Sequence, residues 1–388
     1  MTARGGHLHY VDLIRVLTVG LVIGTHVLAL APVPPTVLMG LLGTVFHTSR
    51  EIFFLLTAFV LTYSTGRKRV HWPRFWRRRL LLVAVPYLLW TVLYFFADGK
   101  PFSGSALVTD VLTGTARYHL YFLLVSLQIY LVFPLVLRLL RATAGRHGPL
   151  LAAAVLFQLA FAAAVQWQWP LGPLSGWVRS PDALLPSYLG YVLAGAIAAW
   201  HRDRLVAWTR RHTRVVALGC AAAIGAAMNV FVIQMFVAGQ PPLRASMVFQ
   251  PAVVVESFAI AGAFLAAGLA WQDSGRRGER LVTAASDASF GIYLGHPLLL
   301  QGALLAAGSL GLTGYAQTVP NAAVLAVLVL VLAPALYLAS GLVTALARRT
   351  PASLALTGRT WSRPAPPPRE AVRTGSLAES LAESGGTR

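Results

Sequence analysis

The chain has 388 residues, of which 56% are apolar and only 12% are charged. A soluble globular domain carries about twice that share of charged residues, so the composition excludes an ordinary soluble fold and indicates a membrane protein. The net charge is +19, yet the arginines lie between apolar segments rather than in one patch, which argues against nucleic-acid binding.

About ten apolar segments are long enough to span the hydrocarbon core of a bilayer. The loops after the second, fourth, sixth and eighth segments are rich in arginine, whereas the loops between them carry few cations. This asymmetry predicts an all-α polytopic membrane protein with about ten transmembrane helices and both termini in the cytoplasm. The segments cover residues 10–31, 42–64, 78–97, 118–140, 149–167, 183–200, 214–238, 250–271, 287–308 and 320–346.

The composition changes after the last apolar segment. The stretch RPAPPPRE and the Ser/Glu/Gly-rich residues behind it cannot bury a core. We therefore expect an integral membrane domain over residues 1–348 and a disordered cytoplasmic tail over residues 349–388. The single cysteine, Cys220, excludes an intrachain disulfide and a Cys-based metal site, and no metal centre is expected.

The first apolar segment contains three groups that a membrane helix normally avoids: Asp12, Arg15 and His26. Arg15 and His26 are eleven residues apart, so they share one helix face and lie about 16 Å apart along the axis. Asp12 and Arg15 are three residues apart and can pair. His26 lies past the middle of the helix, where it is either a core histidine bonded to a neighbouring helix or a general base.

Other polar residues also fall inside apolar segments, where they are costly and are often functional. Ser289, Tyr293 and His296 follow an i, i+4, i+7 row and therefore share a face of the ninth segment. The further candidates within the membrane are Glu256, His119, Tyr293 and His296.

Two features near the membrane surfaces each have two interpretations. The basic stretch before the third segment is typical of lipid head-group binding, but its arginines would equally suit the phosphates of an acyl-CoA, because guanidinium groups bind phosphate through paired hydrogen bonds. The tryptophans of QWQWPLGPLSGW suit an interfacial aromatic belt, or stacking against a sugar ring. The residues concerned are Arg74, Arg77, Arg78, Arg79, Trp167, Trp169 and Trp177.

Taken together, these stretches resemble the acyltransferase family 3 of integral membrane proteins over roughly residues 8–345. The family carries an arginine, ten intervening residues and a histidine, usually after a D-x-x-R opening, and Asp12, Arg15 and His26 match this spacing. The similarity continues, in family order, through FFLLTAFVLTY, FWRRRLLLVAVPYLLW, HLYFLLVSLQIYLVFP and SFGIYLGHP. Leu82 stands where many members have a second arginine, which leaves open which arginines meet a CoA phosphate.

The resemblance, closest to the exopolysaccharide-modifying subgroup, implies a multi-pass cell-membrane O-acyltransferase. It would move an acetyl or similar group from acyl-CoA to a hydroxyl of a carbohydrate, a cell-surface glycan or a glycosylated metabolite. His26 would be the general base, with Arg15 and Asp12 in the catalytic set. No cofactor would stay bound, because acyl-CoA is a co-substrate. The residues implied for donor binding are Arg74, Arg77, Arg78 and Arg79.

The alternative function is a proton-coupled transporter or exporter of organic acids or polysaccharide. In that case Arg15, His26 and Glu256 would form a path for protons or anions through the membrane. The partners expected for the acyltransferase are the acyl-CoA donor, the carbohydrate or metabolite acceptor and the lipid bilayer. A transporter would instead show flux that depends on a gradient and would release no CoA.

Overall fold

The computed structural model describes residues 7–66, 69–99 and 101–361. Within these ranges the chain is helical and contains no β-strand. Nine helices of the described part are long and apolar enough to cross a membrane, and the sixth predicted segment is a shorter apolar helix over Leu185–Trp200. The prediction of an all-α polytopic membrane protein is therefore confirmed.

The helices follow the apolar segments closely. They are α1 His9–Ala29, α2 Val37–His47, α3 Ser49–Thr65, α4 Trp72–Ala97, α5 Gly104–Thr113, α6 Tyr121–Ala142, α7 His147–Gln166, α8 Ser175–Arg179, α9 Leu189–Trp200, α10 Arg202–Arg211, α11 Thr213–Phe236, α12 Pro242–Ala245, α13 Pro251–Asp273, α14 Glu279–Ser309, α15 Leu312–Ala316, α16 Asn321–Val327, α17 Ala333–Ala347 and α18 Ser353–Thr357, with one-turn helices η1 Gly172–Leu174, η2 Leu185–Tyr188 and η3 Leu328–Leu332.

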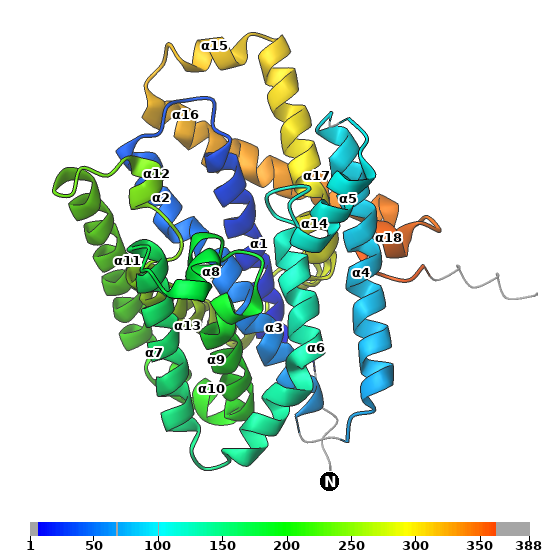
Figure 1. Cartoon of the computed structure of the whole chain (residues 1–388), viewed down its shortest axis with the longest axis vertical. Coiled ribbons are helices and arrows are strands. Elements are labelled where there is room, and N and C mark those ends of the chain that lie inside the picture. The colour runs from blue at the N-terminus through cyan, green and yellow to red at the C-terminus, as the bar shows by residue number, and fades with distance from the viewer. Residues whose placement is uncertain (1–6, 67–68, 100, 362–388) are drawn as a thin grey trace, which may run out of the picture.

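The central helices are α1 and α3, with α7, α9, α11 and α13 on one side and α4 and α6 on the other (Figure 1). Helix α1 packs against α14, α13, α2 and α3, so its polar residues face other helices rather than lipid. Helices α3 and α9 make the closest approach, because a Cβ atom at Gly195 would lie only 2.0 Å from the carbonyl oxygen of Leu55. Only glycine allows this contact.

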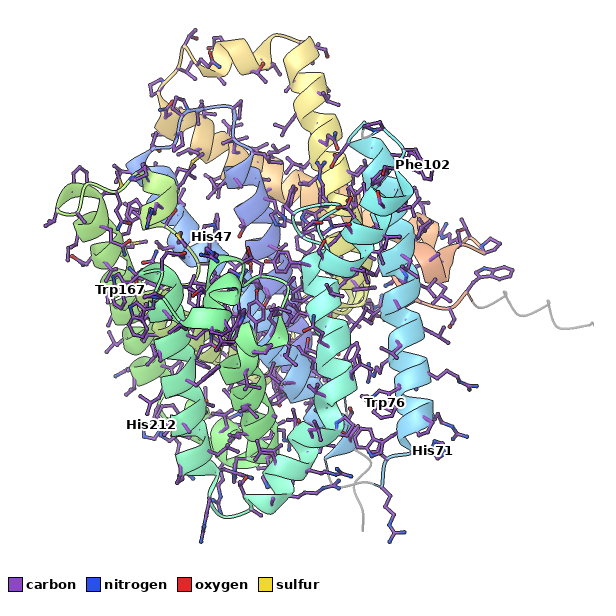
Figure 2. All side chains as sticks on the ribbon, in the orientation of Figure 1. His47, His71, Trp76, Phe102, Trp167 and His212 are labelled. Atoms are coloured by element: carbon purple, nitrogen blue, oxygen red, sulfur yellow. The ribbon has the colours of Figure 1, made fainter. Side chains whose placement is uncertain are left out.

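One end of the molecule carries the arginine-rich segments. Helix α10 and the start of α4, near His71, both lie at the lower end of the molecule (Figures 1 and 2). Figure 2 also shows Trp76 between α4 and α6, where its Nε1 donates to the carbonyl of Tyr130 at 2.9 Å. We call this the basic end, and the end near α5, α12 and α15 the opposite end.

Several helix boundaries differ from the predicted ones. Helix α4 begins at Trp72 rather than residue 78, because His71 caps it by accepting a hydrogen bond from the amide of Arg74. Helix α14 begins at Glu279 rather than 287. The second segment is broken at Thr48 into α2 and α3, and α6 begins at Tyr121, so His119 precedes it. Hydropathy alone does not mark these ends, since polar residues extend a helix beyond its apolar part.

Part of the predicted tail is ordered. Residues 349–361, which we call the C-terminal strap, contain α18, and this helix packs against α4, α14 and α17. Trp90 Nε1 donates to the carbonyl oxygen of Leu356 at 3.2 Å and so ties the strap to α4. The rest of the tail, residues 362–388, lies outside the described residues.

Candidate active site

Helices α1 and α14 run side by side in the same direction, and their polar residues meet at two levels. Nδ1 of His26 lies 2.7 Å from Nε2 of His296, and the two ring planes differ by 10° with their centroids 5.0 Å apart. Nearer the basic end, Nη1 of Arg15 donates to the hydroxyl of Ser286 at 2.9 Å. Arg15 and His26 therefore share the face of α1 that contacts α14, as their spacing predicts.

The hydrogen bonds assign a tautomer to both imidazoles. Nδ1 of His296 lies 3.0 Å and 2.9 Å from the carbonyl oxygens of Ile292 and Tyr293, which can only accept. A neutral His296 therefore carries its proton on Nδ1 and accepts through Nε2, so His26 donates from Nδ1. This leaves the lone pair of His26 on Nε2, and no hydrogen bond of the described residues occupies that atom.

Three of the four further candidates within the membrane gather around His26. The ring of His119 lies 6.3 Å from that of His26 and 5.8 Å from that of His296, centroid to centroid. The hydroxyl of Tyr293 donates to the carbonyl oxygen of His119 at 2.5 Å, and the ring of Tyr118 lies 4.7 Å from His26. The loop before α6 thus brings two aromatic residues to the histidine pair on α1 and α14.

The fourth candidate, Glu256, is not part of this cluster. It lies on α13 and is completely buried, and neither carboxylate oxygen has a hydrogen-bond partner among the described residues. It lines neither of the two cavities described below.

The larger of these cavities, of about 340 Å³, lies on the Arg15 side. We call it the arginine cavity, because Arg15, Arg79, Arg348 and Arg359 all line it, with Asp287 as the acidic residue. Four different parts of the chain therefore direct guanidinium groups into one space, which makes it a strong site for a multivalent anion.

The arginines predicted to bind the donor are divided by the structure. Arg79 lines the arginine cavity, whereas Arg74, Arg77 and Arg78 are exposed on the surface of α4. Arg77, Arg78 and Arg79 are consecutive and point about 100° apart around the helix, so they cannot all face the same cavity. Leu82 lines the cavity as well.

Arg15 is held in place by a short polar chain. Ser286 accepts from Arg15 and donates to Oδ1 of Asp12 at 2.8 Å, and the Arg15 Nη1 atom is 3.9 Å from that oxygen. The predicted pairing of Asp12 and Arg15 is thus bridged by a hydroxyl. A guanidinium group has five N–H donors, so binding Ser286 leaves others available to the cavity.

A second cavity, of about 80 Å³, contains His26 and lies on the other side of the cluster. We call it the histidine cavity. Its polar lining includes His47, whose Nδ1 lies 3.0 Å from the carbonyl of Ser246; Figure 2 shows this side chain between the helices. It also includes Arg50, which donates to Glu51, to Asp182 and to the hydroxyl of Tyr121.

The two cavities adjoin at three aromatic side chains. Phe53, Phe122 and Tyr293 line both of them. The ring of Phe122 lies 5.6 Å from that of Phe53 and 5.1 Å from that of Tyr293. We call these three side chains the aromatic junction, and a ligand that extended from one cavity into the other would contact them.

Two other features do not belong to this site. An apolar cavity of about 770 Å³ lies beside Tyr10, Val11 and Ile14 of α1 and contains none of the predicted site residues. His147 and His201, hydrogen-bonded at 2.8 Å, are in its lining. Trp177 stacks on Phe161 in the core, whereas Trp167 and Trp169 are exposed near the end of α7 (Figure 2).

The N-terminal part of α1 holds a group of metal-type ligands. Donor atoms of His7, His9 and Asp12 lie within 4.8 Å of one another. Protein partners already engage them, since His7 bonds to Asp12 at 2.5 Å and His9 lies between Arg276 at 2.9 Å and Glu279 at 3.2 Å. These contacts hold the three side chains together.

Sequence reasoning missed several residues of the site, among them Ser286, Arg348 and Arg359. Ser286 opens the SDASFGIYLGHP stretch and carried a recognisable signal, because it lies ten residues before His296. Arg348 follows the last apolar segment, where a cation is ordinary. Arg359 lies in the strap, and nothing in its sequence neighbourhood indicates a site.

The fold and this cluster define an integral membrane protein with a cluster of polar side chains among its helices. The acyltransferase domain model of the acyltransferase 3 family matches residues 8–339, and the chain belongs to this family of membrane O-acyltransferases. No curated protein and no solved structure matched the chain.

Proposed function

We propose that the protein transfers an acetyl or similar acyl group from acyl-CoA to a hydroxyl of a carbohydrate, a cell-surface glycan or a glycosylated metabolite. The observation that carries this proposal is the position of His26. Its imidazole is oriented by His296, keeps an unoccupied Nε2, and lines a cavity that adjoins one rich in arginine. A general base needs an oriented imidazole with a free nitrogen, and an anionic donor needs a neighbouring site rich in cations.

The reaction follows from the assigned tautomer. Nε2 of His26 accepts the proton of the acceptor hydroxyl while the oxygen attacks the thioester carbonyl. The tetrahedral intermediate then breaks its C–S bond, and the imidazolium returns the proton to the leaving thiolate, which gives the ester and CoA. His296 supports the charged state by accepting from Nδ1 of His26 throughout.

The donor would lie along α1. Arg15 and His26 are separated by about 16 Å of helix, which is of the order of an extended pantetheine arm. The phosphates would occupy the arginine cavity, the arm would cross the aromatic junction, and the thioester would reach His26. The acceptor would enter through the histidine cavity, where Arg50, His47 and Tyr121 offer polar partners for a sugar.

The orientation in the membrane belongs to the same proposal. The basic end would face the cytoplasm, with both termini, because arginine-rich loops are retained on that side. The donor site then opens where acyl-CoA is made, and the histidine cavity faces the outer surface of the cell membrane. This arrangement suits acylation of an exopolysaccharide.

The test uses the purified protein in proteoliposomes with labelled acetyl-CoA and no ion gradient. Transfer of label to a glycan acceptor with equimolar release of CoA thiol supports the proposal. Gradient-dependent flux without thiol release would support the transporter instead. Mass spectrometry of surface glycans and metabolites from a deletion strain identifies the acceptor by the acyl increment that it loses.

A further inference from the structure

The chain after the last membrane helix turns back into the bundle. In the C-terminal strap, residues 349–361, Ser353 donates to the carbonyl oxygen of Arg359 at 2.8 Å and closes the turn. Gly358 has φ +66°, and a Cβ atom there would lie 2.5 Å from Phe290 and 2.7 Å from the carbonyl oxygen of Leu82. The strap is therefore packed tightly against α4 and α14 at this glycine.

This turn places Arg359 at the mouth of the arginine cavity. Thr357, Gly358 and Arg359 all line it. Nη2 of Arg359 donates to Oδ1 of Asp287 at 2.5 Å, and Nη2 of Arg348 donates to the Asp287 carbonyl oxygen at 2.5 Å. The side chains of Arg359 and Asp287 are 50% and 47% exposed, so solvent and ligand can both reach this pair.

The charges of the cavity are unbalanced. Its lining holds four arginines but only one carboxylate among the described residues, that of Asp287. Ser286 and Asp12 already orient Arg15, while Asp287 holds Arg359 and Arg348 together at the mouth. Four guanidinium groups from different parts of the chain match an anion that carries more than one phosphate.

We propose that the C-terminal strap is part of the donor site and that Arg348 and Arg359 bind phosphates of the CoA thioester. This inference rests on the proposed function, because CoA is the donor there. Asp287 keeps Arg359 in place, and a donor phosphate replaces this partner when CoA binds. The strap thereby covers the pantetheine arm below the aromatic junction and helps to exclude water from the thioester.

The experiment measures binding rather than turnover. Purified full-length protein in detergent is titrated calorimetrically with CoA, with dephospho-CoA and with pantetheine, which has no phosphate. The double variant Arg348→Gln/Arg359→Gln is compared with Arg349→Gln, a neighbouring exposed arginine that does not line the cavity. A second variant, Gly358→Val, displaces the strap and keeps both arginines.

We expect the Kd for CoA to rise at least about ten-fold in the double variant and to change by less than about two-fold in Arg349→Gln, because charge-assisted bonds to phosphate are lost only in the first. Gly358→Val should also weaken CoA binding. Pantetheine should bind the wild-type protein, the double variant and Arg349→Gln alike. A smaller loss with dephospho-CoA would assign the strap arginines to the 3′-phosphate.

Two results would overturn the inference. The first is a double variant that binds CoA with the wild-type Kd. The second is a double variant whose affinity for CoA and for pantetheine falls by the same factor, which would show that the two arginines have a structural role only. Either can occur while wild-type protein still transfers acetyl groups, so the proposed function would stand. Transfer from a donor other than CoA, with no CoA binding at all, would reject the strap inference and the donor but keep the role of His26.

Discussion

Nδ1 of His26 on α1 lies 2.7 Å from Nε2 of His296 on α14, and the backbone carbonyls behind His296 assign the direction of this hydrogen bond. This contact is compatible with two roles of His26. It could be a structural histidine bonded to a neighbouring helix, or a general base whose second nitrogen is free. The bond orients the imidazole in either case, so experiments on turnover must separate the two interpretations.

Replacing His26 by alanine or glutamine should reduce kcat by about 10²–10⁴-fold, because the variant has no base at the position of the Nε2 atom of His26. The Kd for CoA should stay within about two-fold of the wild-type value, since the arginine cavity is unchanged. Acetyl transfer is followed by thiol release, and CoA binding by calorimetry. Wild-type turnover in His26→Gln would leave the histidine a purely structural role.

His296 should act as a positioning residue. His296→Ala removes the acceptor that orients His26 and should lower kcat by about ten- to a hundred-fold, whereas His296→Gln keeps an acceptor oxygen and should recover part of the loss. Residues that act as one unit are not additive, so the double variant His26→Ala/His296→Ala should be no slower than His26→Ala. Additive losses would place His296 in a separate step.

The arginines of α4 should differ in their effect on the donor. Arg79 lines the arginine cavity, whereas Arg78 next to it is exposed. Arg79→Gln should therefore raise the KM for acetyl-CoA about ten-fold with little change in kcat, and Arg78→Gln should change it by less than about two-fold. Steady-state kinetics at two salt concentrations measure both. Equal effects would instead support donor binding by the whole basic stretch.

The aromatic junction should control the length of the acyl group. Phe53 lines both cavities beside the histidine pair, and its replacement by alanine opens the passage. We expect Phe53→Ala to shift the ratio of kcat/KM for butyryl-CoA over acetyl-CoA upward by about ten-fold, in keeping with the worth of a methylene group or two in an apolar pocket. A thermal unfolding curve serves as the control for packing, and an unchanged ratio would place the acyl group elsewhere.

Much of the architecture could be predicted from the sequence. Apolar runs of bilayer length predict the membrane helices, because a backbone in hydrocarbon must satisfy its own hydrogen bonds. The spacing of Arg15 and His26 predicts one shared face, because helix periodicity is a local property. The starts of α4 and α14 were less predictable. Their first turns contain polar residues, so these turns lie outside the apolar segments from which the helices were predicted.

The assembly of the site depended on tertiary structure. Nothing in the sequence places His296 against His26, since they are 270 residues apart and meet only because α1 and α14 pack side by side. The position of the C-terminal strap was even less predictable from the sequence. We predicted it as part of a disordered tail, yet α18 packs against the bundle and the strap brings Arg359 to the cavity of Arg15. Local sequence determines which residues are helical and which face is polar; long-range packing decides which polar faces meet, because that depends on the sum of many contacts that no single segment contains.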